Sequence, residues 1–135
     1  MRTPPVPAGI RRQEFYNDRL HDLVIRIAAG ERPAFRTLYG LLAPRVWGEA
    51  VRLLPPGDAR AVTRSTFVEI WHLARHHLDD ETGEVRGWVL AITARRVYDR
   101  TRSGGGSSSH RDGHDHHTHR ELVGLLGPGA DLSRM

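Results

Sequence analysis

The sequence predicts an all-α protein, a compact bundle of about four helices with disordered N- and C-terminal tails. Two observations support this fold class. Apolar residues recur at the three- and four-residue spacings of a helix through most of residues 17–102. No stretch alternates apolar and polar residues for long enough to indicate a β-strand.

The first expected helix follows a loose tail, residues 1–16, which is rich in proline and arginine and shows no apolar period. Asp18 is a suitable N-cap for this helix, and Gly30 is a suitable end. Its apolar stripe has helical spacing and consists of Leu20, Leu23, Val24, Ile27 and Ala28.

The second expected helix has Pro33 in its first turn and ends before the Pro55-Pro56-Gly57 sequence. Pro44 lies inside it, so we expect a kink or a break near Leu42. The apolar face of this helix consists of Phe35, Leu38, Tyr39, Leu42, Val46, Ala50 and Leu53.

Two further helices are expected before residue 103. Asp58 can cap the third, and a polar stretch at residues 78–83 indicates the loop that follows it. The fourth runs from Val85 to about Arg102. The main apolar seam of the third helix consists of Phe67, Ile70, Trp71, Ala74 and Leu78.

Residues 103–135 differ from the rest in composition. Residues 103–109 contain only serine and glycine, which is typical of a flexible linker. A histidine-rich tract follows, and residues 120–126 have the apolar content for one or two helical turns at most. We therefore expect a tail at 1–16, a helical domain at 17–102, and a linker with a histidine-rich tail at 103–135.

The histidine tract contains groups that bind metals. Imidazole and carboxylate are good ligands for zinc, nickel and copper. Gly113 and the preceding linker argue against a preformed helix, so we expect a flexible, weakly metal-binding tail and assign no metal site or cofactor. A metal- or pH-responsive switch is the alternative. The tract consists of His110, His114, His116, His117 and His119, with Asp112 and Asp115 between them.

Composition narrows the function classes. The 135 residues contain no cysteine, no run of about 20 apolar residues and no apolar core of an export signal, which favours a cytoplasmic protein with no membrane span. All 20 cationic side chains are arginine, and the net charge is +4, so the surface attracts polyanions. No set of nucleophile, base and orienting group indicates an enzyme.

Three groups of residues then occur in a specific order. The first is Phe35–Tyr39 with Ala43–Val46, the second is Asp58–Ala59 with Val62–Thr63 and Phe67–Trp71, and the third is Gly83 with Arg86–Leu90, Ala94–Arg96 and Asp99–Arg102. In this order and spacing, residues from about 20 to 102 resemble region 2 of the sigma-70 superfamily, in the extracytoplasmic-function class. The resemblance implies a helical domain that binds the coiled coil of the largest RNA polymerase subunit and reads the −10 promoter element.

The resemblance also implies site residues. A base flipped from the non-template strand would enter a pocket formed by the loop before the last helix, here Asp79–Arg86. The polymerase-binding residues would be Asp58, Thr63, Phe67 and Glu69. Four arginines within two helical turns can follow a phosphate backbone, which agrees with the DNA-reading role of this helix. With Arg86, the expected DNA-binding residues are Arg95, Arg96, Arg100 and Arg102.

Two departures from the family pattern bear on function. Arg60, Ala61, Arg64 and Ser65 stand where the polymerase-binding helix usually carries acidic residues and glutamine, and like charges across an interface oppose binding. About 33 residues follow Arg102, too few for the second domain that reads the −35 element. We expect either a shortened sigma-like protein or a partner that supplies this domain.

The sequence thus favours a sigma factor-like transcription initiation protein that is not an enzyme. Its expected partners are RNA polymerase core and promoter DNA. The alternative is a degenerate sigma-like regulatory module, which binds an anti-sigma factor or another transcription regulator without initiating transcription. Arg60 and Arg64 favour the alternative, and the arginine cluster at residues 95–102 favours the first function.

Overall fold

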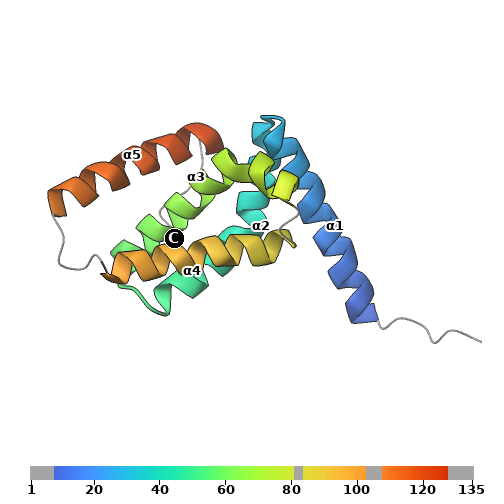
Figure 1. Ribbon diagram of the computed structural model, residues 1–135, viewed down its shortest axis with the longest axis horizontal. Helices are drawn as coiled ribbons and strands as arrows, with labels where there is room; N and C mark the ends of the chain where they lie inside the picture. Colours follow the sequence, from blue (N-terminus) through green and yellow to red (C-terminus); the bar gives the residue numbers. More distant parts are fainter. Residues whose placement is uncertain (1–7, 81–83, 103–107, 128–135) are drawn as a thin grey trace, which may run out of the picture.

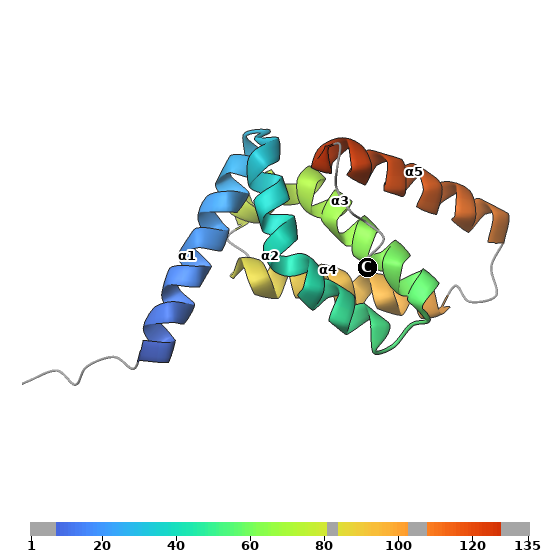
Figure 2. The ribbon, with the colours of Figure 1, turned by 180° about the vertical axis from the view of Figure 1, so that it is seen from behind.

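The computed structural model describes residues 8–80, 84–102 and 108–127, and every regular element in those ranges is an α-helix. This confirms the all-α fold class. Helix α3 lies at the centre, since α1, α2, α4 and α5 all pack against it, and α4 and α5 flank it on opposite sides (Figures 1 and 2). The helices are α1 (Ala8–Ala28), α2 (Arg32–Val51), α3 (Pro56–Asp80), α4 (Val85–Arg102) and α5 (Ser108–Leu126).

Aromatic rings of α2 and α3 form the centre of the main core. Phe67 is fully buried and meets Phe35 edge-on at a centroid distance of 6.5 Å and Tyr39 at 4.8 Å. Burial raises the pKa of Tyr39 to about 12, against a lowering by nearby Arg64, so its hydroxyl stays neutral. Edge-to-face packing of this kind adds to the stabilisation from apolar burial.

Helix α1 starts earlier than the sequence indicated. It begins at Ala8, so residues 8–16 are helical where a tail was expected, and Asp18 lies inside the helix instead of at its start. Residues 1–7 lie outside the described residues. Gly30 does end the helix as predicted, and its φ of 89° places it in the left-handed region. The backbone N–H of Glu31 donates to the carbonyl of Arg26 at 3.0 Å.

Two prolines, Pro44 and Pro56, lie within helices. Helix α2 continues through Pro44 to Val51, so it does not break near Leu42. Helix α3 begins at Pro56, which places Asp58 in its first turn and not at the N-cap position. A proline in the first turn leaves no additional backbone donor unpaired, because the first N–H groups of a helix have no partner within it.

Helix α5 is the largest departure from the prediction. Residues 108–126 form a helix where a linker and a tail were expected, and the helix includes Gly113. Its last turns pack into the main core through Leu122, Leu125 and Leu126, which are 0%, 6% and 7% exposed. Gly127 ends the helix with a φ of 85°, and a side chain there would lie 3.1 Å from the Arg36 guanidinium.

The ring of His77 joins α3 to α4. It is almost fully buried and stacks on Trp88 at a centroid distance of 4.2 Å. Burial lowers the pKa of His77, and His21 of α1 lowers it further. The folded state therefore favours the neutral imidazole.

Phe67→Ala should lower the free energy of unfolding by about 3–5 kcal/mol, because it empties a buried site between two aromatic rings. Chemical denaturation followed by circular dichroism measures this change. Leu53→Ala is the control, since Leu53 is 68% exposed, and it should change the value by less than about 0.5 kcal/mol. A loss below about 1 kcal/mol for Phe67→Ala would contradict its place in the core.

His77 should make the fold sensitive to acid. The folded state lowers the pKa of His77 below its ordinary value of 6.5. The contribution of the neutral ring to the free energy of unfolding is therefore complete above pH 6.5, and it is lost as the pH falls toward the lowered pKa. We expect His77→Phe, which keeps a stacked ring, to lose less stability than wild type between about pH 7 and about pH 5. Denaturation midpoints across this range test the point, and equal losses in the two proteins would disprove it.

Candidate functional site

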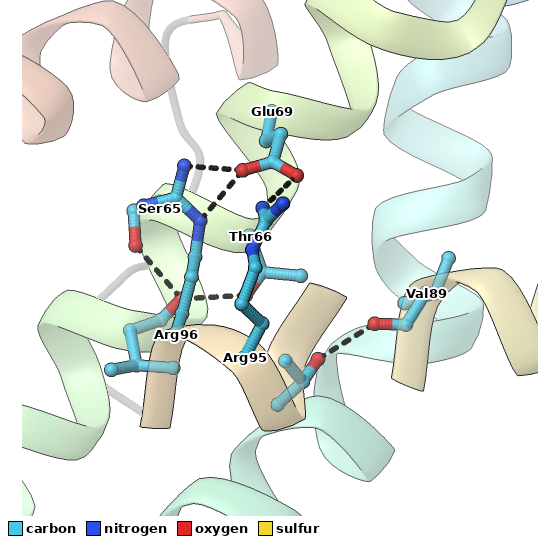
Figure 3. Close-up of polar contacts among 8 residues, drawn as sticks. Ser65, Thr66, Glu69, Val89, Arg95 and Arg96 are labelled. Atoms are coloured by element: carbon cyan, nitrogen blue, oxygen red, sulfur yellow. Dashed lines mark hydrogen bonds and ion pairs between the residues drawn. The ribbon is translucent and has the colours of Figure 1, made fainter. Parts of the chain in front are cut away.

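Glu69 of α3 holds two arginines of α4. Arg96 donates from Nε to one carboxylate oxygen at 3.0 Å, and Arg95 donates to the other (Figure 3). The Glu69 side chain is only 10% exposed, whereas those of Arg95 and Arg96 are 56% and 30% exposed. A guanidinium has five N–H donors, so both arginines retain donors for a further partner.

Two buried threonines lie near the arginines, one on α3 and one on α4. Thr66 donates to the carbonyl of Val62 at 2.8 Å, and Thr93 donates to that of Val89 at 2.9 Å (Figure 3). Each threonine thus satisfies its hydroxyl group within its own helix, so that it can be buried without a partner from another helix.

Arg100 lies between carboxylates of two different helices. Its Nε donates to Asp58 at 3.0 Å, and its two terminal nitrogens donate to Asp115 of α5 at 3.0 and 2.9 Å. Burial alone would lower the pKa of Arg100, but the hydrogen bonds that it donates to Asp115 and Asp58 raise it above its ordinary value. This guanidinium is charged at every physiological pH, and it fixes α5 to α4.

The remaining predicted DNA-binding arginines lie at the two ends of α4. Arg102 is exposed in the last turn, 5.7 Å over the ring of Tyr98. Arg86 is half-buried in the first turn, about 24 Å away along the helix axis. Arg95, Arg96, Arg100 and Arg102 therefore form one cluster that does not include Arg86. The predicted base pocket, Asp79–Arg86, falls partly outside the described residues.

The predicted polymerase-binding residues divide into two groups. Asp58 and Glu69 are half-buried and pair with α4. Thr63 and Phe67 are fully buried, and Thr63 donates to the carbonyl of Ala59 at 2.8 Å. The side chains of the second group therefore pack inside the domain and do not lie on its surface. The structure brings Asp58 and Glu69 together with the arginine cluster.

Arg64, one of the departures from the family pattern, lies against α5. Burial lowers its pKa, as does nearby Arg60, while Tyr39 and Asp115 raise it. The Nε atom of Arg64 is buried and has no hydrogen-bond partner, and the same holds for the Nδ1 atom of His119 on α5. Ala61 is buried, and Ser65 donates to the carbonyl of Val62. Arg64 and Ser65 therefore lie at the contact between α3 and α5.

The sequence interpretation missed the part that α5 plays at this site. Glu121 of α5 forms an ion pair with His72 of α3 when the imidazole is protonated. A cavity of about 350 Å³ next to this contact is lined by Ser65, Val68, Glu69, His72, Leu73, Arg95, Arg96, His114, His117, Thr118 and Glu121. Leucines at positions 122, 125 and 126 have the spacing of a helix face, which was the available signal.

An apolar groove lies on another side of α4. It has a volume of about 520 Å³ and runs between the end of α2 and α4. Two large side chains at its edge, Leu53 and Tyr98, are 68% and 60% exposed. Its lining consists of Glu49, Leu53, Leu90, Thr93, Ala94, Val97, Tyr98 and Thr101.

Residues 8–80, 84–102 and 108–127 contain neither a cluster of metal ligands nor a membrane-spanning helix. Within these ranges, no three histidine, aspartate or glutamate side chains are arranged to hold a metal ion. Within the histidine tract, the structure does not describe the side chains of His110 and Asp112. In the same ranges, none of the helices combines the length and the apolar content that a membrane crossing requires.

Part of the chain is similar to known proteins. The ECF RNA polymerase sigma factor SigK of Mycobacterium ulcerans is 34% identical over 88 residues, which are 64% of this chain and 46% of the relative. SigK of Mycobacterium sp. strain KMS is 31% identical over 93 residues, or 68% of this chain and 48% of the relative. Over about two thirds of its length, the chain is similar to extracytoplasmic-function RNA polymerase sigma factors.

The similarity covers only part of each relative. The chain spans about half the length of the curated relatives it matches, with 46% and 48% of those two relatives covered. SigK of Mycobacterium tuberculosis strain H37Ra is similarly 31% identical over 84 residues, 44% of its length. No protein-family model matches the sequence, and no solved structure matches it.

Glu69→Gln should lower the free energy of unfolding by about 1–2 kcal/mol, because two hydrogen bonds to charged donors lose their carboxylate. The loss is limited because Arg95 is largely exposed, and it should shrink in about 1 M salt. Denaturation at low and high salt measures both effects.

Glu49→Gln is the matched control for this change. Glu49 pairs with Arg45 and Arg52 on the surface of α2, at 3.8 and 3.2 Å, and its replacement should cost less than about 0.5 kcal/mol. Equal losses for the two variants would show that Glu69 makes no special contribution to the α3–α4 contact.

Proposed function

We propose that this protein is a sigma factor-like transcription initiation protein that binds RNA polymerase core and the −10 element of promoter DNA. The observation that carries the proposal is the arginine cluster of α4, held in place by acidic residues of α3. The names of its relatives, ECF RNA polymerase sigma factors, support the same role.

In this proposal α4 contacts the DNA. Arg95 and Arg102 have the most exposed guanidinium groups of the cluster, and they can contact phosphates without leaving their intramolecular partners. Arg96 and Arg100 are held more firmly, so they contribute positive potential and fix the position of the row. Arg86 is the last residue of the predicted base-pocket segment, and would act there and not within the cluster.

Helix α3 contacts RNA polymerase in this proposal. Asp58 and Glu69 supply the negative charge at its surface, and both also hold arginines of α4. Thr63 and Phe67 act through packing, since their buried side chains fix the position of α3. One set of carboxylates thus connects the polymerase-binding helix with the DNA-binding helix.

A second function is favoured by a specific observation. The carboxylates of α3 are already paired within the chain, and Arg60 and Arg64 add positive charge to the same helix. A regulatory module that binds an anti-sigma factor or another transcription regulator, without initiating transcription, fits these contacts. Co-purification with RNA polymerase core distinguishes the two functions, because only the first requires stable binding to core.

The double variant Arg95→Ala/Arg102→Ala should weaken binding of the complex with core polymerase to a fluorescent −10 promoter fork. The slope of log affinity against log salt should fall by about 1–2, because one phosphate contact is lost per arginine. Fluorescence anisotropy over a range of salt concentrations measures this slope.

Arg26→Ala/Arg45→Ala is the control for this experiment. It removes the same charge from exposed arginines of α1 and α2, outside the cluster, and should leave the slope unchanged. If both double variants change the slope equally, net charge and not the α4 cluster determines DNA binding. Binding to core polymerase should be unaffected in both.

A further inference from the structure

Helix α5 covers one side of α3, the helix that we propose contacts RNA polymerase. Its leucines enter the main core, and Leu122 is fully buried. Ser65 and Glu69 of α3 line the same cavity as His117 and Glu121 of α5. Arg64 interacts electrostatically with Asp115 and His119 of α5. The covered part of α3 therefore includes positions where the family's polymerase-binding helix differs from this one.

Two polar contacts attach α5 to the functional helices. Glu121 pairs with His72 of α3, and Asp115 forms a bidentate contact with Arg100 of α4. Asp115 and Asp58 share the same guanidinium, so α5 competes with α3 for an arginine of the proposed DNA-binding cluster. Docking of α5 thus bears on both proposed binding surfaces.

The contact between α5 and α3 is also imperfect. Nε of Arg64 and Nδ1 of His119 are buried there without hydrogen-bond partners, which opposes docking. A cavity of about 350 Å³ separates parts of the two helices. The apolar burial of α5 is concentrated in its last turns, while the ion pairs of Asp115 and Glu121 attach the helix at its surface. Such an interface can be replaced by a partner that satisfies α3 better.

We propose that α5 is an autoinhibitory helix, which occupies the polymerase-binding side of α3 and is displaced when RNA polymerase core binds. This inference rests on the proposed function. A protein whose binding-competent state is only partly populated binds with an affinity reduced by that fraction. Docked α5 therefore weakens binding to core, and release of α5 strengthens it.

Cross-linking tests the inference in the full chain. The sequence contains no cysteine, so His72→Cys/Glu121→Cys introduces two unique thiols at an observed contact. A bismaleimide with a reducible disulfide in its spacer would join α5 to α3. The cross-linked protein should bind core at least about tenfold more weakly than the same protein after reductive cleavage of the spacer.

A loosened variant tests the opposite direction. Asp115→Asn/Glu121→Gln removes both charged attachments of α5 and leaves the leucines in place. It should bind core about tenfold more tightly than wild type and exchange the amide hydrogens of α5 faster. Asp22→Asn/Glu31→Gln is the control, since it makes the same charge change at exposed positions outside α5 and should bind like wild type.

The outcomes separate the two proposals. Weaker binding when cross-linked and tighter binding when loosened support autoinhibition by α5. If the cross-linked and cleaved forms bind core equally, or if the loosened variant binds like wild type, autoinhibition is overturned and the proposed function stands. If no form binds core, including the cleaved and loosened proteins, then the proposed function itself is overturned, and the inference with it.

Discussion

The position of α3 between the four other helices constrains the whole described chain. Its apolar side must fill the core, and its polar side must satisfy charged groups from both α4 and α5. Thr63 and Thr66 are fully buried polar residues on this helix. Burial does not leave their hydroxyl groups unpaired, because each donates to a carbonyl of the preceding turn. Asp58 and Glu69 then lie at the boundary of the core, where partial burial strengthens their attraction to arginine.

Periodicity predicted the parts of the fold whose helices bury a continuous apolar stripe. Helix α4 starts at Val85 and ends at Arg102 as expected, and Gly30 ends α1. Only the last turns of α5 were predicted, because serine, glycine and histidine are weak helix formers and the apolar signal is confined to residues 122–126. Its stability depends on contacts with distant residues, and a local pattern does not contain that information.

For the candidate site, the sequence indicated the residue types but not their partners. Glu69 was assigned to one surface and Arg96 to another, although the two side chains form an ion pair across 27 positions of the chain. Phe67 is a different case. Its spacing with Ile70 and Ala74 already placed it on an apolar seam, which was better evidence than the resemblance. The residues of the site are close together only because α3 and α4 pack, and that geometry is tertiary.

The position of Gly127 determines which side chains of α5 face the core. The helix ends at a residue with positive φ that lies against the Arg36 guanidinium, so the position of its C-terminal end is fixed. One inserted or deleted residue before this point would rotate the preceding part of the helix by about 100°. Glu121 would then turn away from His72, and the leucines would leave the core. Residues 115–127 should therefore tolerate substitutions at exposed positions better than any change in the length of the segment.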